Sequence, residues 1–185
     1  MVLPVRPDLV YLLLNKPAGV ISTADDPQGR PTVVGLVDPG TRVYPVGRLD
    51  ADSEGLLVLT NDGDLAERLT HPRYGVTKTY LALVQGHPGR PALRRLTEGV
   101  DLEDGPARAA SARTIDRSGD GSLVEVVMTE GRNREVRRML DAVGHPVRRL
   151  VRTAIAGLVD RDLKPGDHRP LTLEEVRRLY GAAVG

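Results

Sequence analysis

The stretch Val46–Gly63, which reads VGRLDADSEGLLVLTNDG, decides the fold and the chemistry that we predict for this chain. Within it, the apolar run Leu56–Thr60 has the length and composition of a buried strand. A polar turn precedes this run and begins at the carboxylate Asp50, two residues after Arg48. A glycine stands on either side of the turn, and glycine lets a backbone approach its neighbours closely. The stretch therefore predicts a carboxylate held beside a buried strand.

Strand and helix patterns alternate irregularly on both sides of this stretch. Because they do not follow a strict βαβ order, we predict an α+β fold with a central mixed, mostly antiparallel sheet and flanking helices. The strand Lys78–Val84 is expected to be buried on both faces, because Tyr80, Ala82 and Val84 alternate with Thr79, Leu81 and Leu83. The other predicted strands are Val10–Leu14, Arg42–Val46, Leu56–Thr60, Ala107–Ile115, Leu123–Thr129 and Val147–Val151. Helices are predicted over Asp64–Leu69, from Pro91, around Val136–Val143 and from a capping box of Thr172 and Glu175.

Length and composition restrict the class of protein. A chain of 185 residues predicts a single domain over residues 1–185 with two lobes. The absence of cysteine excludes disulfides and thiolate metal sites and fits a reducing cytosol. No run approaches the roughly 20 apolar residues of a membrane span. We therefore expect a cytoplasmic protein with no membrane partner.

The arginines are distributed unevenly. The net charge is only +1, but arginine outnumbers lysine 23 to 3, and seven arginines lie between Glu130 and Arg152 with only three acids. A local basic stripe suits a phosphate backbone, and arginine binds phosphate through two parallel hydrogen bonds. Genomic base composition is the alternative explanation for the overall bias, and it does not explain the clustering. The stripe therefore predicts an RNA-binding surface.

Three segments carry candidate functional side chains. Asp50 can act as a nucleophile or stabilise a developing charge, although an Asp in a turn is by itself more often a cap or turn former. Tyr80 can stack on a nucleobase and present its hydroxyl, or can pack in the core. In Glu130–Met139, Arg137 borders the apolar helical stripe, where a pair with Asp50 would keep that carboxylate ionised. Arg138 is the alternative partner.

Together these segments resemble motifs of the RsuA/RluB/RluE/RluF group of bacterial pseudouridine synthases. The resemblance runs from about Leu12 to Leu158 and includes Leu14–Gly19 near its start and Arg149–Leu158 near its end. It implies a catalytic domain whose central sheet is split by the active-site cleft. It also implies a reaction without metal or cofactor, with ribosomal RNA or a ribosomal precursor particle as partner. We expect a monomer.

The resemblance implies roles for single residues. Asp50 matches the catalytic Asp, which would convert the N-glycosidic bond of a uridine into a C-glycosidic bond. Arg48 is similar to a residue that fills the space left when the target uridine flips out. Tyr80 matches the base-stacking Tyr, and Arg137 matches the basic partner of the Asp. The further candidates for RNA binding are Lys78, Arg132, Arg134, Arg138, Arg148, Arg149 and Arg152.

The chain departs from the family pattern in two places. Glu135 stands where relatives often have Gln, so an RNA contact by that side chain is not carried over. Many relatives also carry a small N-terminal S4 RNA-binding domain, but only a handful of residues precede the first predicted strand. The chain therefore resembles the short RluE type, which is associated with large-subunit ribosomal RNA.

Three other classes of protein compete with this interpretation. A glycosidase would pair Asp50 with Asp52 or Glu54, since it needs two carboxyls about 5–10 Å apart, but no Trp is present to hold a sugar. A non-catalytic RNA-binding or ribosome-assembly protein would account for the cluster of arginines, but this class gives no reason for the Asp50 and Tyr80 segments. A metal nuclease is disfavoured, because three of the four histidines precede proline and no metal-ligand spacing occurs.

Overall fold

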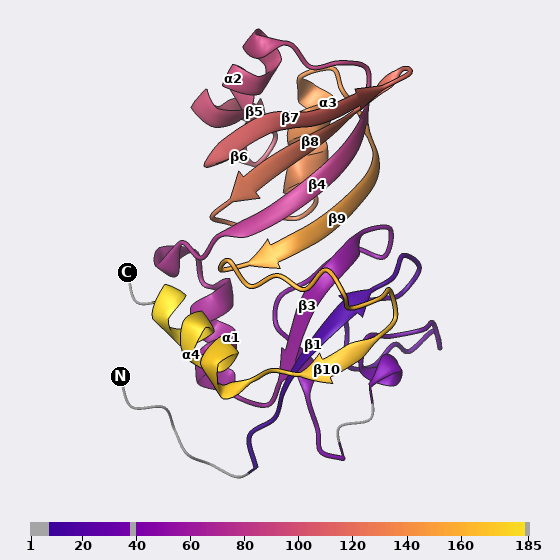
Figure 1. Cartoon of the computed structure of the whole chain (residues 1–185), viewed down its shortest axis with the longest axis vertical. Coiled ribbons are helices and arrows are strands. Elements are labelled where there is room, and N and C mark those ends of the chain that lie inside the picture. The colour runs from indigo at the N-terminus through magenta and orange to yellow at the C-terminus, as the bar shows by residue number, and fades with distance from the viewer. Residues whose placement is uncertain (1–7, 38–39, 184–185) are drawn as a thin grey trace.

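A computed structural model describes residues 8–37 and 40–183, which fold as one long mixed sheet with helices packed against it (Figure 1). The order of the strands along the sheet is β10-β1-β3-β9-β4-β8-β7, and β2 pairs with β3. A separate hairpin consists of β5 and β6. The strands are β1 Tyr11–Lys16, β2 Tyr44–Pro45, β3 Glu54–Thr60, β4 Lys78–Gln85, β5 Val100–Leu102, β6 Gly105–Ala107, β7 Ser111–Ser118, β8 Gly121–Met128, β9 Val147–Ile155 and β10 His168–Pro170. The helices are α1 Gly63–Thr70, α2 Arg90–Glu98, α3 Glu135–Ala142 and α4 Leu173–Ala182, with short 3-10 turns at Val34–Leu36 and Pro72–Tyr74.

The sheet has a seam between its two halves. Neighbouring strands are antiparallel except β3 and β9, which are parallel and pair over Glu54↔Val151 and Gly55↔Arg152 alone. One lobe holds β10, β1, β2 and β3, and the other holds β9, β4, β8 and β7. The predicted α+β fold with a mixed, mostly antiparallel sheet is confirmed.

Gly55 makes this seam possible. Its φ of +117° lies in a region that favours glycine, and a β-carbon there would lie 2.2 Å from the carbonyl oxygen of Arg152. Such a distance is far inside van der Waals contact. The two half-sheets therefore meet only because residue 55 has no side chain.

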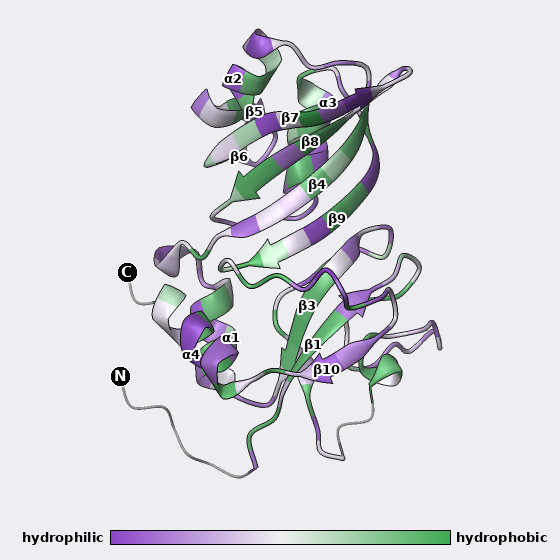
Figure 2. Cartoon of the chain, viewed as in Figure 1, coloured by the Kyte–Doolittle hydropathy of each residue, from purple (hydrophilic) through white to green (hydrophobic). Residues whose placement is uncertain are grey.

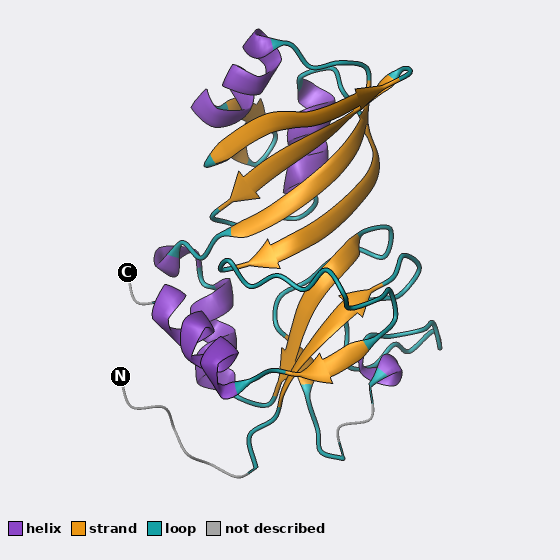
Figure 3. Ribbon diagram, viewed as in Figure 1, coloured by secondary structure: helices purple, strands orange, loops and turns teal. Residues whose placement is uncertain are grey.

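The first lobe is buried on both faces of its central strands. Leu57 and Leu59 of β3 face one apolar cluster, while Leu56 and Val58 face another that includes α1 and α4. Figure 2 shows β1 and β3 as strongly hydrophobic, and Figure 3 shows α1 and α4 side by side against this lobe. Buried Asp62 caps α1 and accepts hydrogen bonds from the hydroxyls of Tyr11 and Tyr180. The Asp50 turn is therefore attached to a rigid lobe.

The second lobe is covered on one face only. Tyr80, Ala82 and Val84 of β4 are buried in the same apolar cluster as the inner residues of α2 and α3. On the opposite face Leu83 is 39% exposed. The prediction that Lys78–Val84 is buried on both faces is therefore wrong, because no helix within residues 8–37 and 40–183 covers the second face of this part of the sheet.

Candidate active site

The turn that carries Asp50 is fixed by backbone contacts on both sides. Its own closing bond runs from the Ser53 N–H to the Asp50 carbonyl oxygen at 2.9 Å. Before the turn, the Ser22 hydroxyl donates to the Leu49 carbonyl at 2.6 Å and accepts from the Leu49 N–H at 3.0 Å. Within the turn, the Gly19 N–H donates to the Ala51 carbonyl at 2.7 Å. The carboxylate of Asp50 is thus presented from a backbone that cannot easily rearrange.

Lys16 holds the same turn through hydrogen bonds to backbone carbonyl oxygens. Its ammonium is fully buried and donates to the carbonyl oxygens of Pro17 at 2.9 Å and Ala51 at 3.4 Å. Burial lowers the pKa of Lys16 to about 8, while the nearby carboxylates of Glu54, Asp52 and Asp50 act in the opposite direction. The sequence places Lys16 in a turn motif, and only the fold reveals that this motif supports the Asp50 turn.

Asp50 and Tyr80 line one cavity of about 280 Å³ together with Arg48. This volume is close to the roughly 300 Å³ at the lower end of small-molecule sites. The loop 130–134 and the start of α3 form the opposite wall. The side chain of Asp50 is 28% exposed, and the residue Tyr80 is 9% exposed. The structure therefore brings together the three segments that the sequence singled out.

The basic partner of Asp50 in the structure is Arg134, and the expected pair with Arg137 is corrected. A nitrogen of Arg134 lies 3.5 Å from Asp50 Oδ2. Arg137 instead donates to the Asp52 carbonyl at 3.0 Å and the Ser53 hydroxyl at 3.2 Å, and lies 3.6 Å from the Asp52 carboxylate. Arg137 does border the interior as predicted, since its side chain is 12% exposed. Helical periodicity gave that position but not which acid of the turn it meets.

The backbone of Arg134 is unusual. Its φ of +51° places a non-glycine residue in the left-handed region at the N-cap of α3. Such conformations cost about 1–3 kcal/mol and cluster at functional sites. With this backbone conformation, the Arg134 guanidinium donates hydrogen bonds to both carboxylate oxygens of Asp52, at 2.9 and 3.0 Å. The strain is thus located where the loop 130–134 meets the Asp50 turn.

The two carboxylates that follow Asp50 in the turn, Asp52 and Glu54, each form an ion pair with an arginine. The hydrogen bonds from Arg134 hold the pKa of Asp52 below its usual range. Both oxygens of Glu54 accept hydrogen bonds from Arg149, at 2.8 and 2.9 Å. A glycosidase needs a second carboxyl group that is protonated at working pH or that positions water. These pairings therefore disfavour the two-carboxylate glycosidase.

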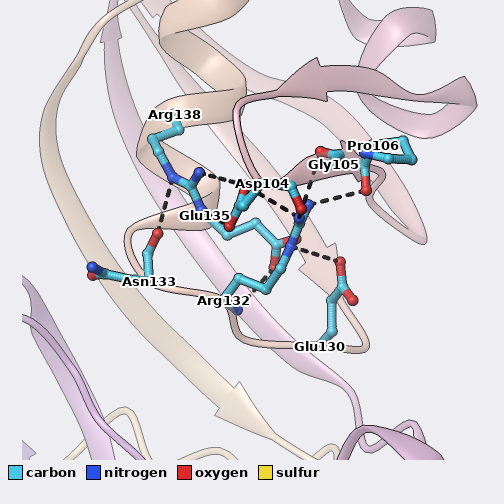
Figure 4. A network of polar contacts seen from close by, with 8 residues as sticks. All are labelled: Asp104, Gly105, Pro106, Glu130, Arg132, Asn133, Glu135 and Arg138. Carbon is cyan, nitrogen blue, oxygen red and sulfur yellow. Dashed lines mark hydrogen bonds and ion pairs between the residues drawn. The ribbon is translucent and has the colours of Figure 1, made fainter.

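Arg132 and Arg138 hold the cavity wall in place (Figure 4). The Arg132 guanidinium donates to the carbonyl oxygens of Asp104 at 3.1 Å and Pro106 at 3.0 Å, in the β5–β6 hairpin, and to Glu135 at 3.0 Å. Arg138 donates to both carboxylate oxygens of Asp104, at 2.7 and 3.1 Å. Most of their donors are therefore used inside the protein. Both side chains therefore position the loop 130–134, and their contact with RNA stays a prediction.

Arg148, Arg149 and Arg152 do not continue one stripe. Arg149 lies on the same face of β9 as Val151 and Thr153, while Leu150 and Arg152 lie on the cavity face, because successive side chains of a strand alternate. Arg148 pairs with Asp120 at 2.9 Å, beside the β7–β8 turn. The seven arginines therefore do not form one continuous stripe. Those of β9 are divided between the two faces of the sheet, and the other four lie in the loop 130–134 and α3.

Glu135 is the buried acid of the network in Figure 4. Burial and the neighbouring Glu130 raise its pKa from 4.5 to about 7. Near neutral pH this side chain is thus partly protonated, and a protonated Glu is neutral and close in shape to Gln. A neutral Glu is accommodated in this buried position at less cost than a carboxylate.

We expect Glu135→Gln to flatten the pH dependence of stability. Between about pH 4.5 and 7 the folded protein keeps a proton on Glu135 that the unfolded chain has released. The contribution of this group to stability therefore falls as pH rises through that window. The amide cannot release a proton, so above pH 7 the variant should gain about 1–3 kcal/mol relative to wild type, compared with pH 5. Melting curves from pH 5 to 8 measure this, with exposed Glu98→Gln as the control. Parallel curves for Glu135→Gln and wild type would contradict it.

The fold and the cavity define a class of protein. A sheet split by a seam, with Asp50 and Tyr80 lining one cavity at the seam, suits chemistry on the sugar and base of one nucleotide. Comparisons with known proteins agree. The family model described as RNA pseudouridylate synthase matches residues 10–142. The chain belongs to this family and is an RNA pseudouridine synthase.

Individual relatives support this assignment over most of the chain. Ribosomal large subunit pseudouridine synthase B of Bacillus subtilis is 46% identical over 181 residues, covering 96% of this chain and 74% of that protein. Ribosomal large subunit pseudouridine synthase E of Xanthomonas campestris is 44% identical over 177 residues, covering 86% of this chain and 94% of that protein.

Solved structures show the same fold. A crystal structure of a pseudouridylate synthase matches with a TM-score of 0.82 and 34% identity, covering 93% of this chain and 74% of that one. Human RNA pseudouridylate synthase domain containing 1 matches with a TM-score of 0.57 and 19% identity, covering 92% and 91%, and so shows the fold alone. In the described part of this chain, no helix has the length and apolar character of a membrane span.

Proposed function

We propose that this protein converts one specific uridine of large-subunit ribosomal RNA into pseudouridine, with Asp50 as the nucleophile. The observation that carries this proposal is the placing of Asp50, Tyr80 and Arg48 around one cavity at the seam of the sheet. The substrate is inferred from the names of two relatives, both of which specify the large ribosomal subunit.

In the reaction that we propose, the Asp50 carboxylate attacks C1′ of the uridine. The N1–C1′ bond breaks, and its electron pair leaves with the uracil. The uracil then turns, C5 attacks C1′, and the bond between C1′ and Asp50 breaks. Finally C5 loses its proton and N1 gains one. The product is an isomer of the substrate, so no external oxidant or reductant is consumed and no metal or cofactor is required.

The cationic side chains around the cavity have separate roles in this proposal. Arg134 places positive charge 3.5 Å from Asp50. Arg137 holds the turn, because its guanidinium donates to the Asp52 carbonyl and the Ser53 hydroxyl. Arg48 has no acidic partner among the described residues and would occupy the space that the flipped uridine vacates. Arg148 and Arg149 stay candidates for RNA contacts outside the cavity.

Both walls of the cavity and all of these groups come from one chain, and one sheet runs through both lobes. We therefore infer that the protein works as a monomer with a single two-lobed catalytic domain. A ribosomal RNA substrate would place it in the cytoplasm.

The substrate is tested by tritium release. Wild-type protein is incubated with large-subunit or small-subunit ribosomal RNA transcribed with 5-tritiated uridine. We expect release from large-subunit RNA, to a limit of about one tritium per molecule, since only one uridine is modified. Release from small-subunit RNA alone would contradict the proposed substrate and leave the class of enzyme intact.

Tyr80 is expected to have two separable roles. The flipped base must be held while it detaches and turns, and stacking on an aromatic ring stabilises a base by about 1–3 kcal/mol. Among the described residues the Tyr80 hydroxyl has no hydrogen-bond partner, so it is available to substrate. Tyr80→Phe should retain RNA binding and bond cleavage but slow the loss of the C5 proton, whereas Tyr80→Leu should lose both functions.

Single-turnover rates with uridine and 5-deuterated uridine measure the role of the hydroxyl. A primary isotope effect that appears in Tyr80→Phe and is absent from wild type supports proton removal by Tyr80. A Phe variant as fast as wild type would restrict Tyr80 to stacking.

A further inference from the structure

A second cavity, of about 100 Å³, adjoins the catalytic cavity and shares Arg48, Tyr80 and Gly131 with it. We call it the cation pocket and define it by its three cations, Arg48, Lys78 and Arg152. No acidic side chain lines it, and its floor is apolar. The pocket is therefore a small positively charged space beside the site that holds the base.

These cations lack the acidic partners that the other arginines near the site possess. In the described part of the chain, Arg48 and Lys78 have neither an ion pair nor a hydrogen bond from their side chains. Arg152 is 5% exposed and donates only from Nε, to the Leu56 carbonyl at 2.8 Å. In contrast, all six other arginines between residues 132 and 149 pair with a carboxylate. The charges of these six arginines are thus largely neutralised by carboxylates, whereas the charges of the cation pocket are not.

An unpaired charge beside apolar side chains is costly, because it has lost water and gained no counter-ion. Burial lowers the pKa of Lys78 to about 8, and the charge of Arg152 acts in the same direction. Charged groups that are costly to desolvate are concentrated at functional sites, where a ligand can supply the missing partner. A bound anion would supply the missing negative charge.

The register of the sheet fixes the pocket relative to the base. Tyr80 of β4 pairs directly with Arg152 of β9, and Lys78 lies two residues before Tyr80 on the same face. The anion would therefore lie next to the ring on which we expect the flipped uracil to stack. In RNA the group found one sugar away from every base is a phosphodiester.

We propose that the cation pocket binds one phosphodiester of the substrate RNA, adjacent to the flipped uridine, through Lys78 and Arg152. This inference rests on the proposed function and adds to it the group that anchors the extruded nucleotide. The phosphate fixes the sugar while the base detaches and turns, so that C1′ stays in front of Asp50. The RNA contacts of this enzyme are then concentrated at the seam of the sheet.

The test compares Lys78→Met, Lys78→Arg and the matched control Lys164→Met. Lys164 is exposed and lines neither cavity. Affinity for large-subunit ribosomal RNA is measured over a range of salt concentrations. Lys78→Met should bind about tenfold more weakly, as for one lost charged hydrogen bond. The slope of log affinity against log salt should fall by about 0.7–0.9, as for one lost phosphate contact. Lys78→Arg should keep most of the slope, and Lys164→Met all of it.

Melting temperature separates a binding role from a structural role. An unpaired, half-buried cation destabilises the free protein, so Lys78→Met should melt above wild type while binding RNA less well. Inorganic sulfate at constant ionic strength should compete with RNA for wild type more than for Lys78→Met. An unchanged salt slope in Lys78→Met, or an equal loss in Lys164→Met, would overturn the proposal. Tritium release by wild type is scored separately, so failure of the pocket and failure of the proposed function are distinguishable.

Discussion

Asp50→Asn is expected to lower pseudouridine formation by at least about 10³-fold, because the amide lacks the charge and the nucleophilicity of the carboxylate. RNA affinity should stay within about threefold of wild type. The folded state should lose less than about 1 kcal/mol, because the ion pair between Asp50 and Arg134 is partly exposed and Arg134 keeps its contacts with Asp52. Tritium release from labelled ribosomal RNA measures the activity, and a filter-binding assay measures the affinity.

Asp52→Asn is the matched comparison for this variant. It changes the same functional group in the same turn and contacts the same Arg134, but Asp52 has both oxygens held by that guanidinium. We expect a much smaller loss of activity, from a less well-fixed turn. If both variants lost activity equally, or if Asp50→Asn kept wild-type turnover, a single nucleophile at Asp50 would be wrong.

Gly55→Ala is expected to have the largest effect on the fold, a loss of about 3–5 kcal/mol, which is a large fraction of the stability of a typical domain. Two costs combine. Residue 55 has φ +117°, and its β-carbon would lie 2.2, 2.5 and 2.8 Å from the O, N and C atoms of Arg152. Because these are backbone atoms, no side chain can turn away, and β3 and β9 must separate. Chemical denaturation of the purified variant measures the loss.

Gly105→Ala separates the two costs. Gly105 has nearly the same φ, +115°, but its β-carbon would meet only the far end of Arg132 at 3.8 Å, which is ordinary contact. This control should therefore lose only the backbone cost of about 1–3 kcal/mol. Equal stabilities of Gly55→Ala and Gly105→Ala would show that close approach at the seam contributes nothing.

Local patterns in the sequence predicted most of the elements but few of their tertiary contacts. The capping box of Thr172 and Glu175 forms at the start of α4, and the apolar spacing of Val136, Met139 and Leu140 gives α3 its buried side. The capping box and the apolar spacing both depend only on residues that are close together in the sequence. In contrast, β10 pairs with β1 over only three residues and is polar, so no periodicity marks it. The predicted strand Arg42–Val46 shrinks to Tyr44–Pro45 for a similar reason, since only its contact with β3 defines it.

The candidate site shows the same contrast between local motifs, which could be predicted, and tertiary contacts, which could not. Asp50, Tyr80 and Arg137 were predicted from motifs, and the fold does bring their segments to one cavity. Which cation meets which acid could not be predicted, because it depends on the left-handed backbone at Arg134 and on the approach of the β5–β6 hairpin. The seven arginines do not form one stripe, because four lie in the loop 130–134 and α3, and strand alternation separates Arg149 from Arg152 on β9. Lys16 and Ser22, which hold the Asp50 turn, lie 34 and 28 residues away from Asp50 in sequence and carry no local sign of this role.

The most direct test of the central claim is a map of pseudouridines in ribosomal RNA. The RNA is taken from a strain that lacks this protein and from the same strain complemented with wild type or with Asp50→Asn. Our account predicts that one pseudouridine of the large-subunit RNA disappears in the deletion strain, returns with wild type and stays absent with Asp50→Asn. A deletion strain that keeps every pseudouridine, or a site restored by Asp50→Asn, would contradict the account.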